Sequence, residues 1–148
     1  MAFQFSLRSL LRLRRTYEQR ERLRLALLNS SRARLRHDLE EAASQRVQEF
    51  EGFMTRLQAG LTGAEFHLDE ASLQQSAKKQ HELSALLAAL ELQVKKQVEA
   101  FRESQMKRKT LDSLRERELH AFQMIENRRE QQLIDDLFAR RQASHLDG

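Results

Sequence analysis

The stretch Gly52-Phe-Met-Thr-Arg-Leu-Gln-Ala-Gly60-Leu-Thr-Gly63-Ala-Glu-Phe-His-Leu-Asp69 holds three of the four glycines in this chain of 148 residues. The fourth glycine is the last residue, and the chain has no proline. Glycine inside a helix costs about 1 kcal/mol relative to alanine, so a glycine cluster is the clearest helix interruption in a proline-free chain. We therefore predict one turn, at about residues 60–67, between two helices. Asp69 is a suitable N-cap for the second helix.

The composition favours long helices over a compact globular core. Charged residues make up 32% of the chain and aromatic residues 6%. Leu, Ala, Glu, Gln and Arg predominate, and this bias with a recurring apolar stripe is typical of coiled coils. Chains this polar can instead be disordered. The sustained periodicity and the lack of proline favour helices.

Apolar residues recur at spacings of three and four on both sides of the turn. From about residue 6 to 59 the stripe comprises Leu7, Leu10, Tyr17, Leu28, Leu35, Leu39, Ala42, Phe53 and Leu57. From about residue 68 to 143 it comprises Leu73, Ala77, Leu83, Leu87, Leu90, Val94, Val98, Phe101, Leu111, Leu119, Phe122, Ile125, Leu133 and Leu137. We predict an all-α protein, in which two long helices form an antiparallel coiled-coil hairpin and the second helix is longer. Residues 1–148 would form this single domain.

Pairing the two stripes about the turn predicts a register. In that register Leu57 lies opposite Leu73, Leu39 opposite Leu90, and Leu7 opposite Phe122. Glu21 lies opposite Arg108, so two charged interruptions of opposite sign would share a layer and fix the register at some cost in stability.

The same register leaves the end of the second helix without a partner. Roughly twenty residues, or about 30 Å of helix, would extend beyond the first helix. This extension carries apolar Leu133, Ile134, Leu137 and Phe138 among many charges. An unpaired helix with an apolar face is more often a partner-binding element than a free one.

Signals of catalysis or metal binding are absent from the sequence. There is no glycine-rich phosphate loop and no Gly-x-Ser-x-Gly elbow. There is no cysteine, and the five histidines do not have the spacing of metal ligands. We predict a protein that is not an enzyme, with no catalytic, cofactor-binding or metal-binding residues.

The arginine-rich start suggests an alternative function. Residues 1–36 contain ten arginines against Glu18 and Glu21. Such a segment could bind nucleic acid or an anionic membrane surface. The arginines are spread around the helix, however, and no base-reading motif is present. No apolar run approaches the roughly 20 residues that a membrane span needs. An unrelated coiled-coil protein that binds nucleic acid or an anionic membrane therefore stays as the alternative.

Three features together resemble the family of the flagellar export protein FliJ and its type III secretion stalk relatives. The start, Phe3-Gln-Phe-Ser-Leu7 followed by Leu10-Leu-Arg-Leu-Arg14, is similar to the opening of that family. The chain length and the glycine-marked turn also match. The C-terminal runs Leu114-Arg-Glu-Arg117 and Glu126-Asn-Arg-Arg-Glu-Gln-Gln-Leu-Ile-Asp-Asp-Leu-Phe-Ala-Arg-Arg141 resemble its most recognisable segment.

The resemblance implies a function and partners. The chain would be a cytoplasmic, non-catalytic stalk and adaptor of the flagellar type III protein export apparatus. It would couple the hexameric export ATPase to the export gate protein FlhA and handle export chaperones, without binding nucleic acid. It would lie at the cytoplasmic face of the inner membrane, held there through its partners alone. A packed coiled-coil seam suits this function because it resists bending and slip.

The resemblance also implies two sets of binding residues. The ATPase-facing surface would comprise Phe3, Phe5, Leu7, Arg129, Gln132, Leu133, Asp136, Leu137 and Arg140. The gate-facing residues near the turn would be Phe50, Phe53, Leu61, Phe66 and Leu73. Around the turn the chain departs from the family, because Gln45, Glu49, Ser72 and Ser76 occupy positions where relatives often have aromatic or large aliphatic side chains.

Overall fold

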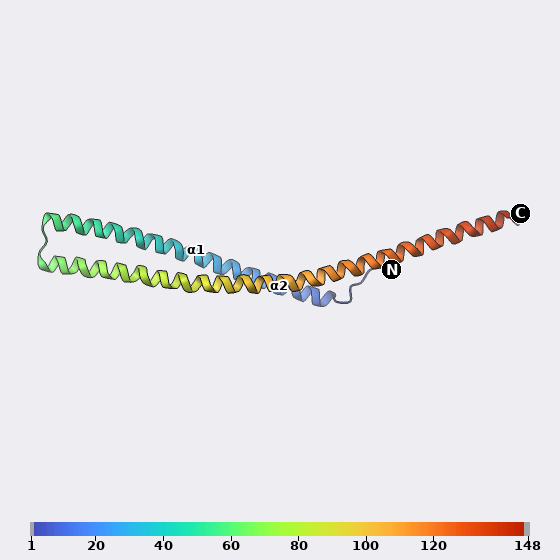
Figure 1. Cartoon of the computed structure of the whole chain (residues 1–148), viewed down its shortest axis with the longest axis horizontal. Coiled ribbons are helices and arrows are strands. Elements are labelled where there is room, and N and C mark those ends of the chain that lie inside the picture. The colour runs from blue at the N-terminus through green and yellow to red at the C-terminus, as the bar shows by residue number, and fades with distance from the viewer. Residues whose placement is uncertain (1, 147–148) are drawn as a thin grey trace. The chain divides into compact units, whose positions relative to one another are not determined.

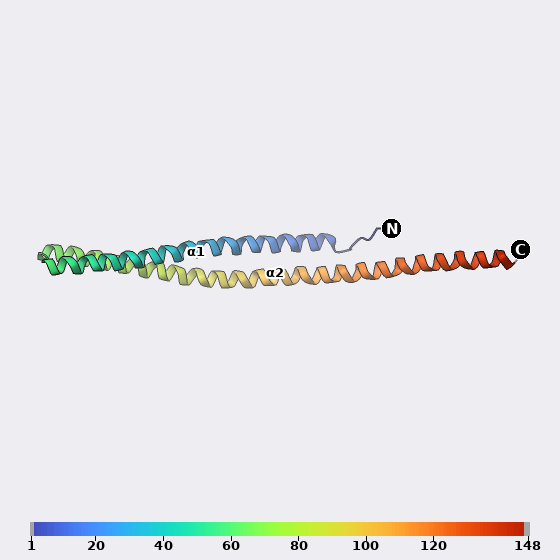
Figure 2. The same ribbon diagram turned by 90° about the horizontal axis from the view of Figure 1, so that it is seen from above.

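The computed structural model describes residues 2–146, and within them the protein is all-α (Figures 1 and 2). Helix α1 spans Arg8–Ala59 and helix α2 spans Gly63–Leu146, with 52 and 84 residues respectively. The two helices form an antiparallel hairpin, and the second is longer, which confirms the predicted fold class. Compact packing divides the chain into two units. One comprises residues 20–102; the other combines the residues up to 19 with those from 103 onward.

The turn is shorter than predicted, because α2 begins at Gly63 instead of near residue 68. Gly60 ends α1 with a φ of 101°, a left-handed conformation that favours glycine. Thr62 and Glu65 form a capping box. The Thr62 backbone N–H donates to a Glu65 carboxylate oxygen, and the Glu65 N–H donates to Thr62 Oγ1, both at 3.3 Å. Asp69 is therefore not the N-cap.

Asp69 instead holds the two helices together near the turn. Its carboxylate accepts hydrogen bonds from Arg56 Nε and Nη2, both at 3.0 Å. This forked pairing joins α1 to α2 across one edge of the seam. The prediction for Asp69 was wrong because Thr62, seven residues earlier, already satisfies the first N–H groups of α2.

In the unit of residues 20–102, α1 and α2 lie side by side in both views (Figures 1 and 2). The α2 side of the seam follows the predicted stripe: Val94 is buried, and Leu73, Leu83, Leu87, Leu90 and Val98 are half-buried. On α1, Ala42 is buried and Leu28, Leu35 and Leu39 are half-buried. Charged side chains flank the apolar layers, as where Arg36 Nη2 pairs with Glu91 Oε1 at 3.0 Å.

In the unit formed by the two chain ends, the α1 side of the seam differs from the prediction. Leu11 and Phe5 are buried, with 3% and 7% of their surface exposed. The predicted seam residues Leu7, Leu10 and Tyr17 are instead exposed, because the face of α1 that meets α2 is displaced by one residue. Leu57, near the turn in the other unit, is also exposed.

An ion-pair network interrupts the apolar seam of this unit. Arg108 on α2 donates from Nε to Glu18 Oε2 at 2.6 Å and from Nη2 to Glu18 Oε1 at 3.1 Å. A third bond joins Arg108 Nη1 to Asp112 Oδ2 at 2.8 Å, and Arg15 Nη2 donates to Asp112 Oδ1 at 3.0 Å. Glu18 is 5% exposed, so its charge depends on these partners for solvation.

The predicted pairing of Glu21 with Arg108 was wrong by about one turn of α1. Glu21 instead accepts a hydrogen bond from Arg24 Nη1 at 3.1 Å, and its backbone carbonyl accepts one from Gln97 Nε2 at 3.1 Å. Stripes with the same 3-4 spacing permit both alignments, so periodicity alone does not decide between Glu18 and Glu21.

The network makes the stability of the fold depend on pH through Asp112. Hydrogen bonds from Arg108, and then from Arg15, lower the pKa of the Asp112 carboxyl, although burial opposes this shift. A lowered folded-state pKa stabilises the protein above the unfolded-state value, about 3.9, and this contribution is lost as the pH falls through the lower folded-state pKa.

We expect Asp112→Asn to be less stable than the wild type at neutral pH, and the difference to shrink below about pH 4. Urea unfolding of both proteins from pH 7 to pH 2.5 measures it. The comparison isolates Asp112, since every other carboxylate is common to both proteins. A stability difference that stays constant over this pH range would contradict the assignment.

Candidate functional site

The last turns of α2 present an exposed apolar face. Residues 127–146 are all exposed. Among them Leu133, Ile134, Leu137 and Phe138 expose 59–63% of their surface. Spacings of three and four place these side chains along one side of the helix. We call these four residues the C-terminal apolar face. The figures show this part of α2, in red, extending past the start of the chain (Figures 1 and 2).

Polar residues border the C-terminal apolar face. Ile134, Leu137 and Phe138 line a shallow hollow together with Arg140, Arg141 and Ser144. Arg129 pairs with Glu126 at 3.6 Å, and Gln131 donates to Asp135 at 3.2 Å. Of the predicted ATPase-facing residues, Arg129, Gln132, Leu133, Asp136, Leu137 and Arg140 all lie on this exposed part of α2. An apolar strip with a charged border is the pattern of a helix that binds a protein groove.

The predicted N-terminal members of the ATPase-facing surface lie elsewhere. Phe3 packs against Phe122 of α2, with ring centroids 5.6 Å apart. Phe5 is buried, and Leu7 is 37% exposed. Phe3 thus packs the segment before α1 against α2. The structure does not bring these three residues together with the C-terminal apolar face, although both lie in the same unit.

The predicted gate-facing residues lie on both sides of the turn. The rings of Phe53 and Phe66 are 5.7 Å apart and join α1 to α2. Leu61 in the turn is half-buried. Phe50, 54% exposed, and Leu73 line a groove between the helices with Val47 and Ala77. Arg46, Glu51, Glu70, Gln74 and Gln80 give this groove a polar border.

Val47, in the groove near the turn, was not singled out from the sequence. It precedes Phe50 by three positions, and this helical spacing was the available signal. Ile134 and Phe138 were named as apolar residues of the extension but were left out of the predicted ATPase-facing set, and both belong to the C-terminal apolar face.

Within residues 2–146, no group of three or more His, Asp or Glu side chains could hold a metal ion. Neither helix contains, in that range, a stretch long and apolar enough to cross a membrane.

Comparison with known proteins identifies the family. The model of the family described as the flagellar FliJ protein matches residues 3–146, which is nearly the whole chain. The chain belongs to the FliJ family. FliJ proteins are non-catalytic components of the flagellar export apparatus. No curated protein and no solved structure matches this chain.

Family membership settles the coarse function. This FliJ-family chain is a component of the flagellar export apparatus. It is therefore not an unrelated coiled-coil protein, which was the alternative from sequence. The match extends over both α1 and α2, so it includes the C-terminal apolar face and the groove near the turn.

Proposed function

We propose that this FliJ-family chain is an adaptor that couples the export ATPase hexamer to the export gate protein FlhA and handles export chaperones. It would act in the cytoplasm, at the inner membrane, through these partners. Its contribution would be to bind and to position, with the chemistry carried out by the ATPase. Membership in the export apparatus supports the general function. The two exposed surfaces of the chain suggest how the partners are divided.

The observation that carries the proposal is the C-terminal apolar face. Four large apolar side chains, each about 60% exposed, are concentrated within six residues of one helix. Burial of apolar surface contributes roughly 25 cal/mol per Å², so this face favours association with a partner. We assign it to the ATPase, with Arg129, Gln132, Asp136 and Arg140 as the polar border that orients the helix.

The groove near the turn is assigned to FlhA. Phe50 and Leu73 provide exposed or half-exposed apolar surface there, and Arg46, Glu51 and Glu70 provide charges of both signs. Helix α2 begins at Gly63 close to this groove and ends at Leu146, beyond the C-terminal apolar face. A single helix thus contains residues of both proposed surfaces. Binding of one partner can therefore affect the surface for the other through the backbone hydrogen bonds of α2 and the packing of the seam.

Truncation separates the two assignments. A chain that ends at Glu126 lacks the C-terminal apolar face but keeps the hairpin and Phe122, which packs against Phe3. We expect it to lose binding to the purified ATPase while it keeps binding to the cytoplasmic domain of FlhA. Isothermal titration with each partner measures both affinities. Unchanged ATPase binding by the truncated chain would disprove the assignment of this face.

A further inference from the structure

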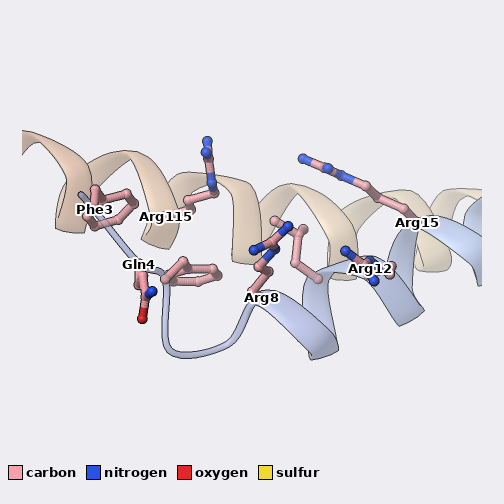
Figure 3. Close-up of a pocket in the computed structure, with 8 residues that line it drawn as sticks. Phe3, Gln4, Arg8, Arg12, Arg15 and Arg115 are labelled. Atoms are coloured by element: carbon pink, nitrogen blue, oxygen red, sulfur yellow. The ribbon is translucent and has the colours of Figure 1, made fainter.

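A hollow near the start of α1 is lined by arginines. Its wall comprises Phe3, Gln4 and Phe5 from the N-terminal segment, Arg8, Leu11, Arg12 and Arg15 from α1, and Arg115 from α2 (Figure 3). The volume of the hollow is about 520 Å³. All eight residues belong to the unit formed by the chain ends. None of these eight residues belongs to the surfaces that were assigned to the ATPase and FlhA.

The positive charge of this hollow is not compensated by its surroundings. No Asp or Glu lines it. Arg15 pairs with Asp112 at 3.0 Å. Among residues 2–146, the side chains of Arg8, Arg12 and Arg115 have no ion pair and no hydrogen bond. The first turn of α1 contains no acidic residue, so the positive end of the helix adds to the same potential.

Helical geometry explains why these arginines share one side. Arg8, Arg12 and Arg15 follow each other at spacings of four and three, which places them on one face of α1. Arg115, from α2, also lines this hollow, and Figure 3 shows it on the helix that runs beside the start of α1. Like charges at these spacings destabilise a helix. Water screens the repulsion between these arginines only in part. A bound anion would neutralise it further and so stabilise the helix.

We propose that this hollow binds the phosphoryl groups of a small, free phosphate compound that carries two or more of them. Arg8, Arg12 and Arg115 are the ligand-binding residues. The guanidinium group presents planar, paired N–H donors that match phosphate oxygens. Three uncompensated positive charges suit a diphosphate better than a single carboxylate. The volume lies within the range of small-molecule sites, roughly 300–1,000 Å³.

The shape of the hollow favours a free compound over a membrane or a peptide. The aromatic residues Phe3 and Phe5 line the hollow together with arginines from both α1 and α2. A lipid headgroup or an acidic peptide has similar anionic oxygens. Each is attached to a bilayer or a polypeptide, however, which would also have to be accommodated at the hollow. Pyrophosphate, phosphatidylglycerol vesicles and polyglutamate therefore serve as three separate probes.

Titration calorimetry of the full-length chain at low salt tests the proposal. We expect the wild-type chain to bind pyrophosphate. The double variant Arg12→Gln with Arg115→Gln should raise the dissociation constant for pyrophosphate at least tenfold, because hydrogen bonds between arginine and phosphate are strengthened by their charges. The matched control is Arg34→Gln with Arg117→Gln. It removes the same charge from exposed positions of the same two helices that do not line the hollow. We expect the control to bind pyrophosphate as the wild type does.

Three results would overturn the proposal. The first is equal weakening in the hollow variant and the control, which would show a response to net charge alone. The second is binding of phosphatidylglycerol vesicles or polyglutamate without binding of pyrophosphate, which would assign the hollow to a membrane or to an acidic protein. The third is absence of pyrophosphate binding by the wild type. Circular dichroism of each variant confirms that the helices are intact.

Discussion

Replacing Leu133 and Leu137 by aspartate is expected to weaken binding to the export ATPase by at least 100-fold. Both side chains belong to the C-terminal apolar face and expose 63% and 60% of their surface. A large side chain at the centre of an interface contributes about 2 kcal/mol or more, and 100-fold corresponds to about 2.7 kcal/mol. Aspartate removes the apolar contact and introduces a charge that must be desolvated on binding.

The fold should survive this double substitution. Leu133 and Leu137 lie outside the seam, since all residues of α2 from 127 to 146 are exposed. Circular dichroism should therefore show nearly unchanged helicity, and the hairpin should unfold at the same urea concentration. Fluorescence anisotropy with labelled ATPase measures the affinity.

A matched pair of leucines on α1 provides the control. Leu23 and Leu27 have the same spacing of four residues and expose 57% and 70% of their surface. Leu23→Asp with Leu27→Asp makes the same chemical change at residues that do not belong to the proposed surface. We expect this variant to bind the ATPase with wild-type affinity. Equal losses in both variants, or wild-type affinity of the first, would show that the C-terminal apolar face does not bind the ATPase.

The second large effect is expected in the seam. Glu18→Leu should lower the free energy of unfolding by about 2–3 kcal/mol. Glu18 is 5% exposed and supplies both oxygens that face Arg108. Without it, Arg108 keeps its bond to Asp112 but loses two of its three hydrogen bonds. Leucine cannot solvate the guanidinium, and this leaves a poorly compensated charge beside the apolar layers.

A second substitution should restore the stability. In Glu18→Leu with Arg108→Leu the layer becomes apolar, and replacement of an ion pair by packed apolar residues is often neutral or stabilising. We expect the double variant to unfold within about 1 kcal/mol of the wild type. Asp112 keeps Arg15 as its partner in this variant.

Urea unfolding, followed by circular dichroism, measures all three proteins. The difference between the single and double variants isolates the cost of the uncompensated Arg108. If the single variant were as stable as the wild type, Glu18 and Arg108 would not form a coupled pair in solution. A double variant no more stable than the single one would show that the layer cannot pack leucines.

The sequence by itself determined the helical elements of this protein. The glycines around residue 60 and the absence of proline predicted one interruption, and α1 ends at Ala59 as expected. The α2 stripe, from Leu73 through Val94 to Phe122, was identified almost completely. These features depend on local backbone preference and on helical periodicity, both of which are properties of the chain without its fold. The exposure of Leu133 and Leu137 was predicted because the second helix is longer than the first and its end has no partner.

The tertiary structure alone decided the register and the surfaces that depend on it. Local chemistry allowed either Glu18 or Glu21 to face Arg108, because the two differ by one helical turn. The folded protein pairs Glu18 with Arg108, and a displacement of one residue buries Leu11 in place of Leu10. The burial of Phe5, and the hollow that Arg12 and Arg115 both line, are also features of the folded protein. Such contacts join residues far apart in the chain, so periodicity within one helix could not specify them.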